Sequence, residues 1–335
     1  MGILIGVGLC AVAGLVIVVD PFFQYHKPLS FLNYVIDNQQ AENAGMIKNF
    51  EYDSVILGSS MTINFDTEVF REELELDTIK LSVNAAFPKD IHQMLSLIQK
   101  SGKKLDTVFL GIDAHNYSAE PEAVAYPYPE YLYDNNLLND SSYIFNKDVI
   151  LDYIIKPQIQ GNSTKRNEIY WNWPYMYYGK EMIAGSYNKP EITGNSVSED
   201  VYIASTEYNL EHYILPYIEM MSTTQFVVFF PPYSILYWYN HMAEGDIEAL
   251  IYQTEYITQR LLQYPNVKVF QFQNDYDYIT NYDNYCDYTH YSHEMNDYMT
   301  VCFANGENEI TLENYKVVLN DMKEWLLAFD YENCW

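Results

Sequence analysis

A short apolar segment, residues 54–57, is followed directly by Gly58 and two serines, Ser59 and Ser60. A short run of this kind, bounded by a glycine, predicts a strand that is buried on both faces. A strand that ends in glycine and places a serine at the start of the next helix is one way to present a nucleophile. Gly-Ser-Ser also occurs in ordinary loops, so this interpretation needs support from elsewhere in the chain.

Short apolar segments alternate with amphipathic segments along much of the chain. The predicted strands are residues 54–57, 78–83, 106–112, 225–230 and 267–272, and the main predicted helices are residues 66–75, 88–100, 206–221, 243–263 and 311–329. This alternation predicts an α/β fold in which a five-stranded parallel sheet carries helices on both faces. A chain of 335 residues is long enough for one large domain of this kind.

The alternation stops between residues 113 and 205. This stretch is rich in Tyr, Pro and Asn, and residues 126–133 nearly alternate Tyr and Pro. A structureless loop of this length is rare in a compact domain, so the stretch predicts an inserted subdomain or lid with short helices such as residues 147–155. The predicted domain itself covers residues 51–335, and a connector helix over residues 21–50 precedes it.

The N-terminal segment, residues 2–19, contains no charged residue. As a helix it is about 27 Å long, close to the hydrocarbon thickness of a bilayer. Three interpretations compete: a membrane anchor, a cleaved signal peptide and a buried core helix. The segment lacks a basic flank and a small-residue cleavage site, and Asp20-Pro21 followed by aromatic residues ends it. We therefore expect a single-pass transmembrane anchor over residues 1–20, with the rest of the chain outside the cytoplasm.

The composition is strongly acidic, with 46 Asp and Glu against 18 Lys and Arg and a net charge of −28. This charge argues against nucleic acid as a partner, since nucleic-acid affinity comes largely from basic side chains on phosphates. It also disfavours docking on an anionic lipid surface. An acidic surface suits solubility outside a cell or contact with cationic groups. The 34 tyrosines suit either carbohydrate stacking or the packing of the insertion.

The segment Asp287-Tyr288-Thr289-His290 contains the two groups that a serine nucleophile needs, a base and a carboxylate that orients the base. Asp287 and His290 are three positions apart, so one turn of chain can let the carboxylate hold the imidazole in its reactive tautomer. The carboxyl ends of parallel strands share one edge of the sheet, so loops after the first and last strands can meet there. We predict a catalytic set of Ser60 as nucleophile, His290 as base and Asp287 as its orienting group.

With Gly-Ser-Ser60 near the start and Asp287-x-x-His290 near the end, most of the chain outside the insertion resembles the SGNH/GDSL hydrolase superfamily. It looks most like the membrane-anchored branch that includes teichoic-acid D-alanyl-transfer and polysaccharide O-acetyl-transfer proteins. The resemblance implies a flavodoxin-like α/β/α fold and a serine esterase or acyltransferase without a cofactor. It also implies O-acyl groups of an extracellular polymer as substrate, and a membrane-bound O-acyltransferase as a candidate partner.

The same resemblance predicts an oxyanion hole made of three donors. Ser60 supplies a backbone N–H, and Ala86 stands where the family has a glycine. Asp113 stands where the family has an asparagine, although the anchored relatives also tend to lose that residue. An ionised carboxylate donates nothing and repels an oxyanion. Three explanations stay open: Asp113 is protonated, Asn84 or Asn116 replaces it, or the activity is narrower than that of an ordinary esterase.

Other sites and functions were weighed against this one. His290, His293 and Glu294 lack the His-Glu-x-x-His order of zinc peptidases, and Asp275-x-Asp277 lacks the rest of a calcium loop, so we expect no metal. A disulfide between Cys286 and Cys302 remains open. Two further hypotheses concern function. One is a catalytically weak or inactive SGNH-type protein that binds an envelope polymer or a membrane acyltransferase, and the other is a tethered structural protein.

Overall fold

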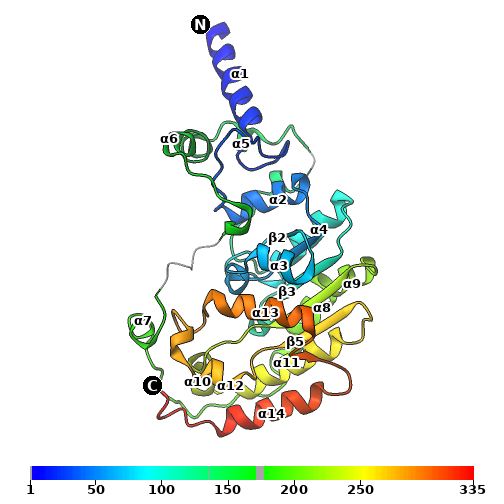
Figure 1. The fold of residues 1–335 in the computed structure, drawn as a ribbon, viewed down its shortest axis with the longest axis vertical. Coiled ribbons are helices and arrows are strands. Elements are labelled where there is room, and N and C mark those ends of the chain that lie inside the picture. Colours follow the sequence, from blue (N-terminus) through cyan, green and yellow to red (C-terminus); the bar gives the residue numbers. More distant parts are fainter. Residues whose placement is uncertain (1, 135, 171–176) are drawn as a thin grey trace. The chain divides into compact units, whose positions relative to one another are not determined.

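The computed structural model describes residues 2–134, 136–170 and 177–335. The chain divides into two compact units (Figure 1). The first unit comprises Met1–Tyr52, Gln93–Lys103 and Tyr126–Tyr170, and the second comprises Asp53–His92, Lys104–Ala125 and Trp171–Trp335. Helix α4 (Pro88–Ser101) has residues in both units.

A six-stranded, mostly parallel sheet forms the centre of the second unit. Its strands are β1 (Ser54–Leu57), β2 (Thr78–Lys80), β3 (Thr107–Gly111), β4 (Gln225–Phe230), β5 (Val267–Gln271) and β6 (Glu309–Ile310). Their order is β2-β1-β3-β4-β5-β6, and only β6 runs antiparallel to its neighbour. The mixed α/β fold is as predicted. The prediction of five strands is wrong by one, because β6 has two residues and no apolar run to reveal it.

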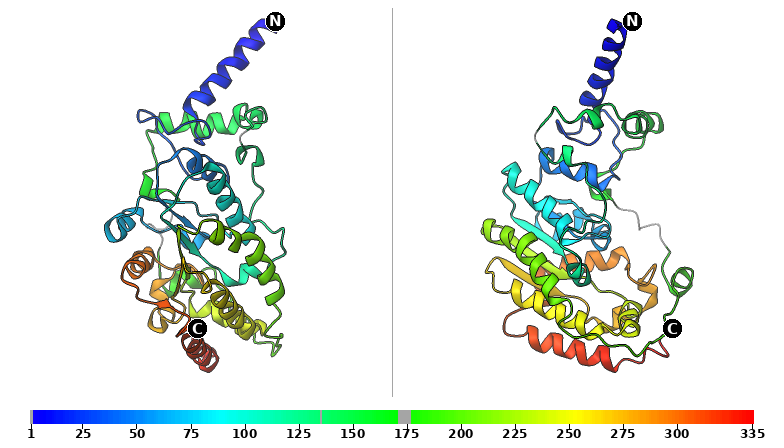
Figure 2. Two further views of the ribbon diagram at one scale, coloured as in Figure 1. Left: turned by 90° about the vertical axis from the view of Figure 1, so that its right-hand side faces the viewer. Right: turned by 180° about the vertical axis from the view of Figure 1, so that it is seen from behind.

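Helices cover both faces of this sheet (Figure 2). The helices of the second unit beyond α4 are α3 (Thr67–Leu74), α7 (Lys180–Ala184), α8 (Ile203–Tyr213), α9 (Leu215–Met220), α10 (Ile235–Glu244), α11 (Ile247–Leu261), α12 (Tyr276–Ile279), α13 (His293–Asn305) and α14 (Tyr315–Ala328). Helices α3 and α13 lie on one face, and α8 and α11 lie on the other. Pro216, at the start of α9, divides what the sequence predicts as one helix over residues 206–221.

An aromatic cluster fills the face of the sheet beneath α3 and α13. Phe303, on α13, is 5% exposed. Its ring centroid lies between 5.1 and 6.2 Å from those of five other phenylalanines: Phe65, Phe109, Phe229, Phe270 and Phe272. The cluster joins α13 to β3, β4 and β5, and so fixes the helix that follows the predicted catalytic histidine.

The first unit combines the N-terminal segment with the middle of the predicted insertion. Its helices are α1 (Gly2–Val19), α2 (Gln39–Asn49), α5 (Ser141–Ile144), the π-helix η4 (Val149–Ile155) and α6 (Lys156–Gln160). Tyr143 donates a hydrogen bond to the buried carboxylate of Asp20 at 2.9 Å, and Tyr170 donates one to Asn43 at 2.9 Å. Residues 113–205 are therefore divided between the two units and do not form one insertion, because long-range contacts decide where each part packs.

Helix α1 ends at Val19, where Asp20-Pro21 predicted its end. The sequence also predicts that this segment crosses a membrane. Among the residues that the structure describes, no helix has the length and apolar character needed to span a bilayer.

The aromatic cluster leads to a prediction about stability. Replacing Phe303 by Ala removes its contacts with five rings and leaves a cavity, so the free energy of unfolding should fall by about 3–5 kcal/mol. Chemical denaturation of the purified protein measures this loss. Phe31 is 78% exposed, and Phe31→Ala is the matched control that should change stability by less than about 0.5 kcal/mol. Equal effects of the two substitutions would contradict the assigned core.

Candidate active site

The turn after β1 holds Ser60 in a short 3-10 helix, η1 (Ser60–Thr62). Gly58 has φ of +151°, which favours glycine, and a Cβ atom there would lie 2.5 Å from the Thr62 methyl group. The Thr62 hydroxyl donates to the Ser59 carbonyl at 2.8 Å. Gly111, at the end of β3, also faces that methyl group, and a Cβ atom there would lie 2.8 Å from it. Glycines at two strand ends thus admit Thr62, and Thr62 in turn fixes the turn that presents Ser60.

A tight loop holds the second part of the site. Tyr285 and Tyr291 form an isolated antiparallel bridge, and the Cys286 N–H donates to the His290 carbonyl at 3.0 Å. Within the loop, Asp287 Oδ1 accepts hydrogen bonds from the His290 N–H at 2.7 Å and from the Thr289 N–H at 2.8 Å. These local bonds orient the carboxylate before it meets the imidazole ring.

Ser60, His290 and Asp287 form a continuous hydrogen-bonded series. Ser60 Oγ lies 2.8 Å from His290 Nε2, and His290 Nδ1 lies 2.6 Å from Asp287 Oδ2. Because Nδ1 faces Asp287, Nε2 is the nitrogen that faces the serine hydroxyl, and this is the geometry of an activated nucleophile. The side chains of His290 and Asp287 are 24% and 31% exposed, so the site is open to solvent.

The charge of Asp287 is stabilised in the folded protein. Burial alone raises the pKa of this carboxyl. Hydrogen bonds from the His290 side chain and from the His290 and Thr289 N–H groups, together with the charge of His290, outweigh burial and lower the pKa of Asp287 to about 2. An ionised Asp287 at neutral pH can hold His290 in one tautomer and stabilise the imidazolium that forms when the histidine takes a proton.

Two fully buried tyrosines attach the histidine loop to its surroundings. Tyr291 donates to the Met61 carbonyl at 2.7 Å, directly beside Ser60, and Tyr285 donates to the Pro232 carbonyl at 2.7 Å. Sequence reasoning missed both anchors. Their positions on either side of Asp287-x-x-His290 are the only signal, and the partners of the hydroxyl groups are distant in the chain.

Asp113 lies beside the serine turn and acts as an acceptor. Tyr233 donates a hydrogen bond to Asp113 Oδ1, and Ser59 is a second side-chain partner. Burial raises the pKa of Asp113, although these two hydrogen bonds and the charge of His290 counteract the shift. Both partners offer hydroxyl groups to the carboxyl, so this arrangement gives an oxyanion no donor from Asp113.

The other predicted oxyanion donors are mostly engaged. The Ala86 N–H donates to the Val83 carbonyl at 3.1 Å, and Asn116 Nδ2 donates to the Ala86 carbonyl at 2.9 Å. The left-handed conformation in this turn falls on Ala85, with φ of +54°, not on Ala86. Asn84 is exposed and has a partner of its own. Within the described residues the Ser60 N–H has no acceptor, so it is the donor best placed for the role. The complete oxyanion hole stays a prediction.

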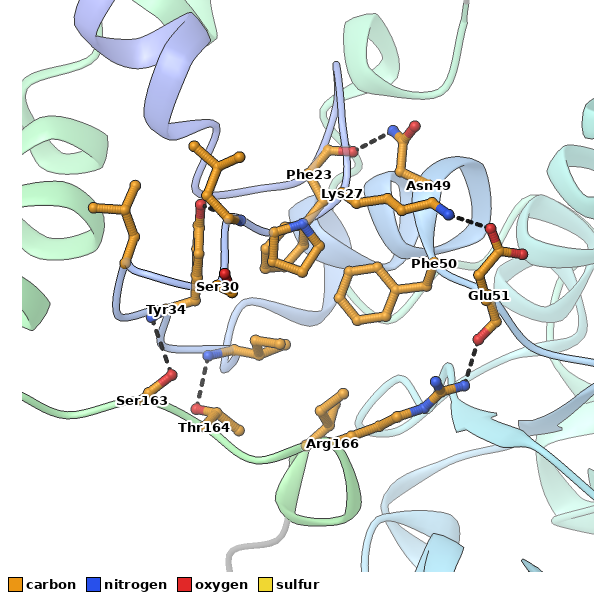
Figure 3. A pocket seen from close by; sticks show the side chains of 15 residues that line it. Phe23, Lys27, Ser30, Tyr34, Asn49, Phe50, Glu51, Ser163, Thr164 and Arg166 are labelled. Carbon is orange, nitrogen blue, oxygen red and sulfur yellow. Dashed lines mark hydrogen bonds and ion pairs between the residues drawn. The ribbon is translucent and has the colours of Figure 1, made fainter.

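A pocket in the first unit has a different character (Figure 3). Its volume is about 420 Å³, and its lining is mainly apolar or aromatic, including Phe23, Tyr34 and Phe50. The charged groups on one side are paired: Lys27 forms an ion pair with the Glu51 carboxylate, and Arg166 donates to the Glu51 carbonyl. The lining offers no serine or cysteine beside a histidine, so nucleophilic catalysis has no candidate there.

The other residues that the sequence analysis considered take no part in the Ser60–His290–Asp287 series. Cys286 and Cys302 are both free, and burial raises the pKa of the Cys286 thiol to about 12. His293 Nδ1 lies 3.5 Å from the Glu294 carboxylate on the first turn of α13. Asp275 caps α12 by accepting from the Tyr278 N–H, so its carboxylate has a local structural partner.

Comparison with known proteins adds no relative. No protein-family model matches the chain, and neither a curated protein nor a solved structure gives a significant match.

Removing the Tyr291 hydroxyl tests whether this anchor positions the nucleophile. In Tyr291→Phe, the Met61 carbonyl loses its 2.7 Å donor and keeps only the longer bond from Asn296 Nδ2 at 3.4 Å, so stability should fall by about 1–2 kcal/mol. Ser60 should also react about tenfold more slowly with a fluorophosphonate probe, because its distance to His290 is less well fixed. Denaturation and labelling rates measure the two effects.

Tyr285→Phe is the matched control for this substitution. Its hydroxyl is equally buried and bonded, but its partner is Pro232 and not the serine turn. We expect a similar loss of stability with a labelling rate close to that of the wild type. Equal labelling rates for the two variants would show that the Tyr291 bond is structural only.

The lowered pKa of Asp287 predicts a pH-dependent stability. An acid whose pKa is lower in the folded state stabilises the fold above its unfolded pKa, near 4, and loses this contribution as the pH falls toward 2. Asp287→Asn should therefore be about 1–2 kcal/mol less stable than wild type at pH 7, and the difference should shrink between pH 4 and pH 2. Denaturation curves across this range measure it. A difference that stays constant down to pH 2 would contradict the assigned hydrogen bonds.

Proposed function

We propose that the chain is a serine esterase or acyltransferase of the SGNH/GDSL type that acts on O-acyl groups, acetyl or D-alanyl, of an extracellular polymer. One observation carries the proposal: the hydrogen-bonded series from Ser60 Oγ to His290 at 2.8 Å and from His290 to Asp287 at 2.6 Å. This arrangement supports nucleophilic catalysis by Ser60 with His290 as its base.

The proposed reaction has two halves. Ser60 Oγ attacks the ester carbonyl while His290 Nε2 takes its proton. The tetrahedral intermediate then collapses, and the leaving alcohol oxygen receives that proton, which leaves an acyl-enzyme. Water or a polymer hydroxyl next attacks the acyl carbon and gives its proton to His290. Ser60 leaves with that proton, and the product is a free acid or a new ester.

The topology of the second unit supports this type of site. The order β2-β1-β3-β4-β5 corresponds to that of flavodoxin-like doubly wound sheets, which bind ligands at the carboxyl ends of their strands. Ser60 follows the carboxyl end of β1, and Asp113 follows that of β3.

The surroundings of the site support a polymer as substrate or acceptor. Tyr288, between Asp287 and His290, is 38% exposed, and its ring lies 5.7 Å from that of Tyr187. An exposed aromatic ring beside a nucleophile offers a stacking surface for a sugar. The acidic charge of the chain suits an alanyl ester, whose amino group is cationic.

A location at a cell membrane, with the second unit outside the cytoplasm, belongs to the same proposal. The apolar side chains of α1 support it: Ile3 and Leu4 are 85% and 79% exposed. An exposed apolar surface of this kind marks a contact with lipid or with a partner such as a membrane-bound O-acyltransferase.

A second candidate function is binding without turnover. Asp113 favours it, because a carboxyl that accepts from Tyr233 occupies the place of an oxyanion donor. Such a protein would hold an envelope polymer or a membrane acyltransferase at the same strand edge.

Ester hydrolysis by the full-length protein distinguishes the two candidates. We expect it to hydrolyse p-nitrophenyl acetate and to bind a fluorophosphonate probe covalently. Ser60→Ala and His290→Ala should each reduce turnover by at least about 10³-fold, because each removes a group that acts in the transition state.

The controls are Ser222→Ala and His212→Ala, which alter exposed residues outside the site. Both should retain wild-type rates. If the wild type neither hydrolyses the ester, nor reacts with the probe, nor transfers an acyl group to a polymer hydroxyl, the binding function replaces the enzymatic one.

A further inference from the structure

Three side chains from separate segments of the second unit converge outside the Ser60–His290–Asp287 set. His115 lies on η2 (Ala114–Ser118), His241 on α10, and Asp246 at the N-cap of α11. Each offers one ligand atom, and the three atoms lie within 4.8 Å of one another. His241 and Asp246 are buried, whereas His115 is exposed.

Hydrogen bonds hold two of these groups in place. His241 Nδ1 donates to Asp246 Oδ1 at 2.9 Å, and Tyr202 donates to Asp246 Oδ2 at 2.6 Å. These hydrogen bonds give His241 and Asp246 their partners, but His115 takes no part in them. Within the described part of the chain, neither ring nitrogen of His115 forms a hydrogen bond, and its ring centroid lies 5.4 Å from that of His241.

Two of the possible ligand atoms, His241 Nδ1 and Asp246 Oδ1, are spaced nearly as two ligands of one metal ion are, and a ligand atom of His115 within 4.8 Å would move closer on binding. Zinc bonds of about 2.0–2.1 Å in tetrahedral geometry place neighbouring ligand atoms about 3.3 Å apart. The 2.9 Å between His241 Nδ1 and Asp246 Oδ1 is thus a few tenths of an ångström short of that separation. A cation would take the place of the proton that now lies between the two atoms, and the exposed His115 side chain would close over it from the solvent side.

We propose that His115, His241 and Asp246 bind a divalent transition-metal ion of the zinc type, with water completing the coordination. Two imidazoles and one carboxylate suit Zn²⁺ and its neighbours, while Mg²⁺ and Ca²⁺ prefer oxygen ligands alone. For the ion to bind through Nδ1, the proton of that nitrogen moves by solvent exchange to Nε2, so His241 stays a neutral imidazole and no net proton is released. The site departs from the sequence-based expectation of no metal and does not depend on the proposed esterase activity.

The cation would also stiffen the surroundings of Asp113. The Tyr237 ring lies 4.5 Å from that of His241 and stacks on Tyr233 at 4.1 Å, and Tyr233 donates to Asp113. His115 and Asp113 belong to the same short segment after β3. A metal ion would therefore join this segment to α10 and to the start of α11.

Metal binding to the full-length protein, stripped with a chelator, tests the proposal. Titration with Zn²⁺ against a chromogenic chelator should give one equivalent per chain, and Co²⁺ should give the visible absorption of a four-coordinate site. Zn²⁺ should also raise the melting temperature by a few degrees, since it binds the folded state only.

Variants locate the site. His115→Ala changes an exposed side chain and should fold normally, yet weaken Zn²⁺ binding by more than about tenfold and abolish the thermal shift. Asp246→Asn, which can still accept from Tyr202, should do the same. His212→Ala, an exposed histidine outside the cluster, should bind as the wild type does. The proposal is overturned if no stoichiometric binding occurs, if His115→Ala binds normally, or if His290→Ala removes the binding instead.

Discussion

The hydrogen bond from the Tyr291 hydroxyl to the Met61 carbonyl joins two segments that are 230 positions apart in the chain. One segment carries Ser60 and the other carries His290, and each is ordered by its own local bonds. Because Tyr291 is fully buried, the bond is shielded from water and costly to break. The 2.8 Å contact between Ser60 and His290 is therefore supported by a buried bond that joins their two segments directly beside it.

The parallel sheet supplies the second constraint. Since β1 and β3 are adjacent and parallel, their carboxyl ends open on the same edge and bring the serine turn beside Asp113. Gly58 directly follows β1 and Gly111 ends β3, and both leave room for the Thr62 methyl group. The aromatic cluster around Phe303 fixes α13 against the sheet, so the loop before this helix has a rigid base.

Asp113, beside the serine turn, is held by hydroxyl groups and not by amide donors. The family resemblance leads one to expect an amide donor at this position, but Asp113 accepts from Tyr233, and the Ala86 N–H is engaged in a turn. For the proposed esterase or acyltransferase activity, few oxyanion donors would require a substrate that stabilises its own oxyanion, or a restricted choice of acceptor. Tyr233 donates to Asp113 and stacks on Tyr237, and the Tyr237 ring contacts His241 of the His115–His241–Asp246 cluster. A metal ion bound by this cluster would therefore also stiffen the segment that carries Asp113.

The sequence by itself determined the features that depend on neighbouring residues. Strands β1 and β4 have the predicted bounds, and α1 ends at Val19, directly before Asp20-Pro21. The Asp287-x-x-His290 spacing already suggests a carboxylate beside an imidazole. Only the tertiary structure decided what depends on contacts between distant residues. It places residues 126–170 with the N-terminal segment, pairs β6 with β5, and engages the Ala86 N–H in a turn. It also gathers His115, His241 and Asp246 from three elements. The physical reason is that strand and turn preferences act over a few residues, whereas packing and hydrogen bonds across a core follow no local pattern.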